Sequence, residues 1–351
     1  MKRFHTMLAV VSLIAGVVGV AVQLFAQPAS PAPAGAAPYG AQAGYQVPRT
    51  ADGHPDLQGV WGNNAATPMT RPRQWKDKAL LSDAELDALK KFAATYVDEG
   101  GDAIFGNFMQ QLLDAKEKGE SKQKSYDPTT GNYNQFWLAD RDWDHRTSLI
   151  TDPPDGQFPP LTPEAQERRK LAAARPRTRG SADGPEDRPL SERCISYGAP
   201  RIQPNYNSYT QIIQSPEAVV LLQEMIHDAR VVPMTNKPHL PPQVRQLHGD
   251  PRGRWEGDSL VVETTNYING FQGSTPNVKL TERYTRVSPD FINWEIKVDD
   301  PATWTAPYTF MIRLKKAEGQ IYEYACHEGN YAMEGILAGA RAEEAKATKK
   351  R

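Results

Sequence analysis

The sequence contains none of the motifs that identify a common enzyme chemistry. There is no G-x-S-x-G nucleophile motif and no glycine-rich P-loop. His327-Glu328 begins like the H-E-x-x-H zinc motif, but the second histidine is missing. We therefore predict neither a metal site nor a cofactor.

The chain also lacks an excess of charge of either sign. Over 351 residues, 41 Lys and Arg are matched by 42 Asp and Glu, which gives a formal net charge of −1. A nearly neutral chain has little electrostatic attraction for a polyanion. We expect no nucleic-acid partner, and we expect the basic cluster around Arg168-Arg169-Lys170 to be a solvated helix end.

Cysteine is scarce. Cys194 and Cys326 are the two in the chain, and neither belongs to a C-x-x-C pair. In an oxidising compartment they are expected to form one disulfide, closing a loop of about 130 residues and stabilising the fold by about 2–4 kcal/mol. Two free, buried thiols are the alternative.

Long hydrophobic runs are absent after the N-terminus. Residues 1–26 have the pattern of a secretory signal peptide: Lys2 and Arg3 are basic, Met7 to Phe25 is apolar, and Ala26 offers a small residue for cleavage. This predicts a periplasmic or secreted protein with no stable membrane insertion after cleavage. A retained membrane anchor is the alternative, since about 19 apolar residues could span a bilayer.

Composition divides the rest of the chain into three parts. Residues 27–47 are rich in Ala, Pro and Gly and predict a flexible linker. Residues 48–200 predict a helical, loop-rich region, with a capping box at Ser82-Asp83-Ala84-Glu85. Residues 201–351 predict an antiparallel β core closed by a helix from Tyr331.

The β core is indicated by short β-branched and aromatic runs separated by turn residues. The connections are too short for parallel crossovers, so neighbouring strands must pair antiparallel. Roughly nine strands in sequence predict a meander that curls into a barrel or a bent sheet, and the fold class is α+β, mainly antiparallel β. The expected strands include Tyr209–Gln214, Ser259–Thr265 and Gln320–Cys326.

Three segments make the chain resemble a family of uncharacterised exported bacterial proteins. They are D-L-Q-G-V-W from Asp56, W-E-G-D-S-L-V-V-E-T from Trp255, and E-R-Y-T-R from Glu282. The resemblance implies export and supplies no activity. The W-x-G pattern before antiparallel strands is also similar to lipocalin-like barrels, an analogy of fold alone.

Candidate catalytic residues lie where strands are expected to end. His227, Asp228 and Arg230 form one cluster, and His327 and Glu328 form another. A histidine oriented by a carboxylate can transfer protons near neutral pH, and an arginine can bind a carboxylate or an oxyanion. Alternatively, the histidines are satisfied by backbone groups and Asp228 pairs with Arg230 as part of the structure.

A small-molecule ligand is the other expectation. The stretch around Gln203, Asn205 and Tyr206 is dense in hydrogen-bonding groups, and aromatic residues of the β region, among them Trp255 and Tyr324, could line an apolar pocket. The same aromatics could simply be sheet core. Three functions follow: an exported binder of a small, partly apolar ligand, a cofactor-independent hydrolase, lyase or isomerase, or a structural envelope-associated protein.

Overall fold

The structure is a computed structural model that describes residues 39–98, 100–123, 133–174 and 180–349. The predicted signal peptide, and the predicted linker up to residue 38, lie outside the described residues.

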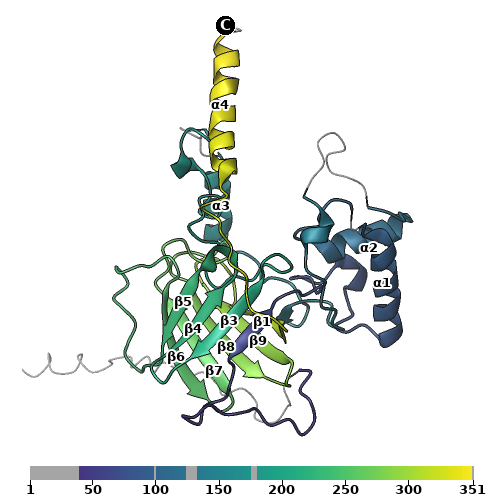
Figure 1. Ribbon diagram of the computed structural model, residues 1–351, viewed down its shortest axis with the longest axis vertical. Helices are drawn as coiled ribbons and strands as arrows, with labels where there is room; N and C mark the ends of the chain where they lie inside the picture. The colour runs from purple at the N-terminus through teal and green to yellow at the C-terminus, as the bar shows by residue number, and fades with distance from the viewer. Residues whose placement is uncertain (1–38, 99, 124–132, 175–179, 350–351) are drawn as a thin grey trace, which may run out of the picture. The chain divides into compact units, whose positions relative to one another are not determined.

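The described chain is α+β and mainly antiparallel β, as predicted (Figure 1). Nine strands follow the order β5-β4-β3-β1-β10-β9-β8-β7-β6 around a nearly closed barrel, and β2 pairs with β10 beside that path. The strands are β1 Gly59–Gly62, β2 Ile150–Asp152, β3 Tyr209–Gln214, β4 Ala218–Gln223, β5 Ala229–Pro233, β6 Asp250–Glu256, β7 Ser259–Thr265, β8 Lys279–Arg286, β9 Phe291–Asp299 and β10 Tyr308–Lys316.

The barrel closes between β5 and β6. Met234, just after β5, forms a parallel bridge with Gly253 of β6, and the Thr235 amide donates to the Gly253 carbonyl over 3.3 Å. Alternate residues of each strand face inward, as the period of a strand requires. The inward-facing Arg230 of β5 meets Glu282 of β8 across this junction, which is consistent with a sheet that has curled on itself.

One predicted strand is wrong. Residues 320–326 form no strand, although their aromatic and apolar composition favours one. Both edges of β10 are already occupied, by β9 on one side and by the short β1 on the other. The segment is held instead by individual bonds, such as that from the Tyr322 amide to the Glu224 carboxylate (3.2 Å).

Among the described residues, four α-helices are present: α1 Asp83–Tyr96, α2 Phe108–Lys118, α3 Pro163–Ala174 and α4 Tyr331–Lys349. The predicted capping box is confirmed, because Ser82 and Glu85 bond each other's backbone at the start of α1. Helices α1 and α2 share a small apolar core of their own. No residue of α4 is buried, and none of the helices within the described ranges is long and apolar enough to cross a bilayer.

Part of the segment expected to be a flexible linker is attached to the folded body. The Tyr39 hydroxyl donates to the Asp144 carboxylate (2.5 Å), and the Tyr39 carbonyl accepts from the Asn293 amide (2.8 Å). The guanidinium of Arg146 also lies 5.0 Å from the centre of the Tyr39 ring. Tyr39 is therefore not part of a free linker, because both its side chain and its backbone are bonded to the folded body.

Candidate functional site

A cavity of about 560 Å³ lies beside the start of β10. This volume is within the range of small-molecule sites. Its apolar lining comes from the barrel side and from α2, and includes Met69, Phe108, Leu149, Ile202, Trp304 and Phe310. Its polar lining consists of Thr67, Asn107, Arg141, Arg169, Gln203 and Gln272, and Tyr308 also lines it.

The aromatic wall is held in place by an interlocked ring cluster. Phe158 stacks on Trp304, with 5.4 Å between ring centres, and meets Tyr308 edge-on at 5.1 Å. Tyr308 and Phe310 point into the barrel core from β10, and both are about 1% exposed. The part of the wall that β10 carries, Tyr308 and Phe310, is therefore rigid and preformed.

The loop that carries Trp304 is fixed by the buried Asp300. This carboxylate accepts from the Thr275 amide (2.6 Å) and from the Thr303 hydroxyl (2.7 Å), and the Asp300 carbonyl accepts from the Trp304 amide (2.9 Å). A carboxylate that receives several bonds from two loops holds them together. Asp300 therefore positions Trp304 without touching the cavity itself.

Arg141 approaches the cavity from the loop before β2. Its Nη1 donates to the Asn205 side chain (2.6 Å) and its Nη2 to the Ile104 carbonyl (2.8 Å), and the guanidinium lies 3.9 Å from the centre of the Phe108 ring. Burial lowers the pKa of Arg141 to about 10, which leaves it protonated at neutral pH. Within the described ranges, no carboxylate forms an ion pair with this guanidinium.

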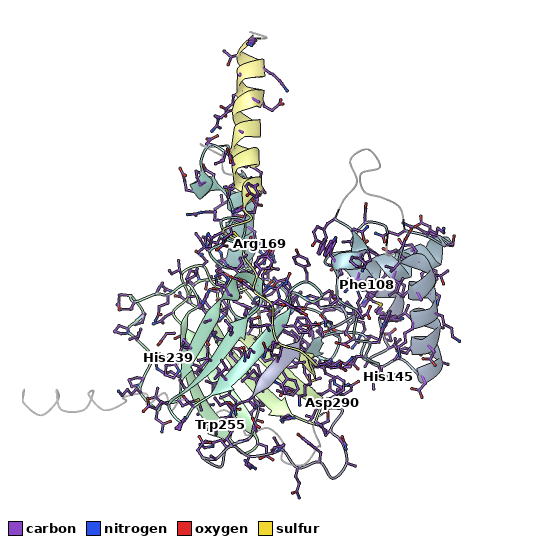
Figure 2. The ribbon with its side chains drawn as sticks, viewed as in Figure 1. Phe108, His145, Arg169, His239, Trp255 and Asp290 are labelled. Carbon is purple, nitrogen blue, oxygen red and sulfur yellow. A yellow bond between two sulfur atoms is a disulfide. The ribbon has the colours of Figure 1, made fainter. Side chains whose placement is uncertain are left out.

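The second cation of the cavity is Arg169 on α3. Its guanidinium carbon lies 5.7 Å from the centre of the Trp304 ring. Figure 2 labels Arg169 together with Phe108, another residue of the lining. The lining contains two arginines and no acidic residue. The cavity thus combines an apolar body with positive charge.

Two of the five predicted ligand-binding residues belong to this region. Gln203 lines the cavity. Asn205 does not line the cavity, but it bonds Arg141, which does. Its Oδ1 accepts from Arg141, and its Nδ2 donates to the Ala139 carbonyl (3.1 Å). Asn205 has a φ of 75°, a left-handed conformation that asparagine tolerates better than most residues.

The other three predicted ligand-binding residues lie elsewhere. Tyr206 belongs to an aromatic cluster with Tyr133 and Phe105, and burial together with the hydrogen bond between the Tyr206 and Tyr133 hydroxyls raises the pKa of Tyr206 to about 12. Trp255 stacks on His54, with 5.0 Å between ring centres. Tyr324 lines a separate cavity of about 340 Å³ next to the disulfide.

The predicted catalytic cluster around His227 is divided by a turn in the backbone. Ile226 and His227 have φ angles of 60° and 44°, and the exposed His227 ring bonds the Tyr324 carbonyl through Nδ1 (3.2 Å). Asp228 faces His248, with 3.7 Å between Oδ1 and Nε2. Arg230 points into the barrel and pairs with Glu282 at 2.6 Å. The alternative of an Asp228–Arg230 ion pair is therefore wrong.

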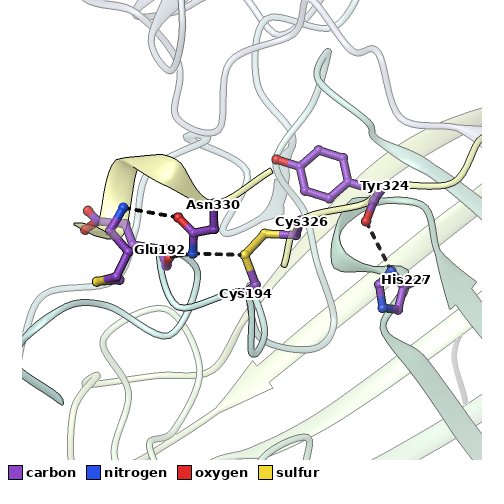
Figure 3. Close-up of a disulfide and its surroundings, with 7 residues drawn as sticks. Glu192, Cys194, His227, Tyr324, Cys326 and Asn330 are labelled. Carbon is purple, nitrogen blue, oxygen red and sulfur yellow. Dashed lines mark hydrogen bonds between the residues drawn. A yellow bond between two sulfur atoms is a disulfide. The ribbon is translucent and has the colours of Figure 1, made fainter. Parts of the chain in front are cut away.

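The disulfide between Cys194 and Cys326 is present, as predicted, with 5.6 Å between the Cα atoms (Figure 3). Asn330 donates to the Glu192 carbonyl (2.9 Å) and to Sγ of Cys194 (3.4 Å), which fixes the chain after the bond. His327 and Glu328 follow Cys326 directly and are exposed. Neither residue lines any of the four cavities described in this section.

A buried polar cluster at the barrel end was not anticipated. His248 Nε2 lies 2.9 Å from the Ser196 hydroxyl, and desolvation lowers the pKa of His248. His248, Asp228 and Arg230 border a space of about 10 Å³, which is at the lower limit for one water molecule. No substrate fits there.

The fourth cavity has a volume of about 470 Å³ and is bordered by Tyr209, Glu224 and Lys315.

No group of three or more metal-ligating side chains occurs among residues that the structure describes.

The recognisable sequence motifs have roles in the fold. Trp61 is fully buried and donates to the Leu57 carbonyl (2.9 Å), while Gly257 takes a φ of 57° in the turn between β6 and β7. Such a conformation favours glycine.

No family model matches the chain, and no curated protein matches it.

The sequence did not single out the cations of the cavity. Arg141 stands in the run Asp140-Arg141-Asp142, where neighbouring acids suggest a solvated loop, and Arg169 stands in a basic helix end. Both arginines are brought to the cavity by contacts far apart in sequence, such as that of Arg141 with Asn205. Trp304 and Tyr308 belong to the aromatic residues of the β region that, as a group, could line a pocket, and both line this one.

Proposed function

We propose that the protein is an exported binder of a small, partly apolar molecule, and that the ligand occupies the cavity beside β10. The observation that carries the proposal is a space of about 560 Å³ bordered by aromatic side chains of the barrel core. Preformed apolar cavities with a few polar groups are typical of ligand sites. The ligand is proposed to bind beside the start of β10 rather than next to Arg230, where the space is only about 10 Å³.

A neutral apolar dye tests this proposal. N-phenylnaphthylamine is expected to bind the wild-type protein with a saturable rise in fluorescence at a ratio of one to one. Ala65→Trp places a large side chain at the cavity wall and is expected to abolish the signal. Ala94→Trp, on the exposed face of α1, is the matched control and should leave binding unchanged. Failure of the wild-type protein to bind the dye would refute the cavity as an apolar site.

Export is the second part of the proposal. It is supported by the signal-peptide pattern of residues 1–26, by the family resemblance, and by the Cys194–Cys326 bond, since disulfides persist mainly outside the cytoplasm. The test is N-terminal sequencing of the protein recovered from the periplasm or medium of a bacterial host. We expect the chain to begin at Gln27. Recovery of the intact chain from the cytoplasm alone would contradict the proposal.

An enzymatic function based on the predicted histidine–carboxylate pairs has less support. Proton transfer needs groups within hydrogen-bond reach of a bound substrate. Asp228 and Arg230 border a space too small for one, while His227, His327 and Glu328 are exposed outside the four cavities. The binding function is therefore preferred, and nothing in the geometry favours the purely structural alternative over it.

A further inference from the structure

The charge of the cavity beside β10 is unbalanced, and this restricts what can occupy it. Its lining holds two arginines and no acidic side chain. A desolvated cation is costly unless it is paired. Arg141 is held by an amide and a backbone carbonyl, which orient its guanidinium but supply no negative charge.

The bonds to Asn205 and Ile104 occupy two of the five N–H donors of Arg141. These two bonds also restrict the rotation of the Arg141 side chain, so the guanidinium is already oriented before an anion binds. A planar guanidinium forms two parallel hydrogen bonds with a planar carboxylate. The arrangement is thus better suited to one planar carboxylate than to a tetrahedral phosphate, which accepts hydrogen bonds from several directions.

Trp304 provides an independent indication. Its side chain lines the cavity and is about 7% exposed, and its buried indole Nε1 has no acceptor among the described residues. An indole N–H can only donate, and a buried donor normally has a partner. The Nε1 atom is itself fully buried, so an acceptor oxygen of a ligand would satisfy it only after a local rotation of the indole toward the cavity.

We propose that the ligand is a small amphipathic carboxylate, whose apolar body lies against the aromatic wall and whose carboxylate pairs with Arg141. This inference rests on the binding function proposed above and names the class of molecule bound. Arg169, over the Trp304 ring, adds positive charge at the same cavity. The uncharged amides of Asn107, Gln203 and Gln272 offer further hydrogen bonds without repelling an anion.

The test compares decanoate with its uncharged counterpart decanol, by titration calorimetry on the oxidised full chain. The wild-type protein is expected to bind decanoate at least about tenfold more tightly than decanol, a difference of about 1.4 kcal/mol. Arg141→Gln should remove that preference while leaving decanol binding within about threefold of the wild type. Arg141→Lys, which keeps the charge but loses the planar fork, should keep part of the preference.

Arg254→Gln is the matched control, since it removes one arginine from an exposed position on β6 and should keep the full preference for decanoate. The comparison of two ligands on the wild-type protein needs no variant, so a misfolded Arg141→Gln would not prevent the test. Equal affinity for decanoate and decanol, with N-phenylnaphthylamine still bound, would overturn the carboxylate and leave the apolar site standing. Tighter binding of decyl phosphate than of decanoate would also overturn it, and absence of dye binding would refute both proposals.

Discussion

The guanidinium of Arg230 on β5 and the carboxylate of Glu282 on β8 meet inside the barrel, with 2.6 Å between Nη2 and Oε1. The second carboxylate oxygen accepts from the Tyr284 hydroxyl (2.9 Å) and from the Trp294 indole (3.2 Å). Burial opposes the charge of Arg230, but attraction to Glu282 and the bond between them raise its pKa overall. Charged side chains thus join two strands that are not neighbours in the sheet.

Removing the acid of this pair should be strongly destabilising. Glu282→Gln keeps the size of the side chain but leaves the charge of Arg230 buried and unpaired, which is expected to cost about 3–5 kcal/mol of unfolding free energy. Urea denaturation measures the loss. Glu256→Gln is the control, because Glu256 pairs with Arg254 and Arg283 at the exposed surface and should cost about 1 kcal/mol or less. Equal losses in the two variants would show that the buried ion pair contributes no more to the free energy of unfolding than the exposed one.

The disulfide should contribute a comparable amount by a different mechanism. It joins residues 132 positions apart, so it restricts the unfolded chain over a long loop. Cys194→Ser and Cys326→Ser are each expected to lower the free energy of unfolding by about 2–4 kcal/mol. A reducing agent should bring the wild type to the same value and leave both variants unchanged. A further loss in the reduced variants would contradict this expectation.

His248 should make stability depend on pH. Desolvation lowers its pKa in the folded state, while Asp228 raises it and Arg230 lowers it. The unfolded chain therefore takes up the proton first as the pH falls below the ordinary histidine pKa near 6.5, and the contribution of this group is lost progressively from there down to its lower folded-state pKa. His248→Gln should reduce the difference in unfolding free energy between about pH 7.5 and about pH 5.5. An unchanged difference would exclude His248 as its source.

Asn205 offers a second way to alter the proposed anion site. In Asn205→Asp, the new carboxylate would face Arg141 and compete with the ligand for it. We expect decanoate binding to weaken about tenfold, with N-phenylnaphthylamine binding unchanged. Asn277→Asp is the matched control, because Asn277 accepts from Arg245 in an exposed position away from the cavity (2.6 Å). Equal weakening by both substitutions would point to a general effect of negative charge.

Local sequence chemistry predicted many elements well. Strands Tyr209–Gln214 and Ser259–Thr265 have the bounds expected from their residues, and the last helix begins at Tyr331 as expected. The reason is that periodicity, turn residues and caps act over a few neighbouring positions. Residues 320–326 were misassigned because their state depends on whether β10 has a free edge, which is decided by β1 from far away in the chain.

The antiparallel character of the β core and the helix start at Ser82 follow from local sequence alone, and the N-terminal pattern leads to the expectation of export. The sequence also made Cys194 and Cys326 the partners of any disulfide within the chain, because there are no others. The tertiary structure alone decided that Arg230 pairs with Glu282 rather than Asp228, and that Arg141, Trp304 and Phe108 border one cavity. These relations depend on how the sheet curls and on contacts between distant segments, and neither property is encoded by spacing along the chain.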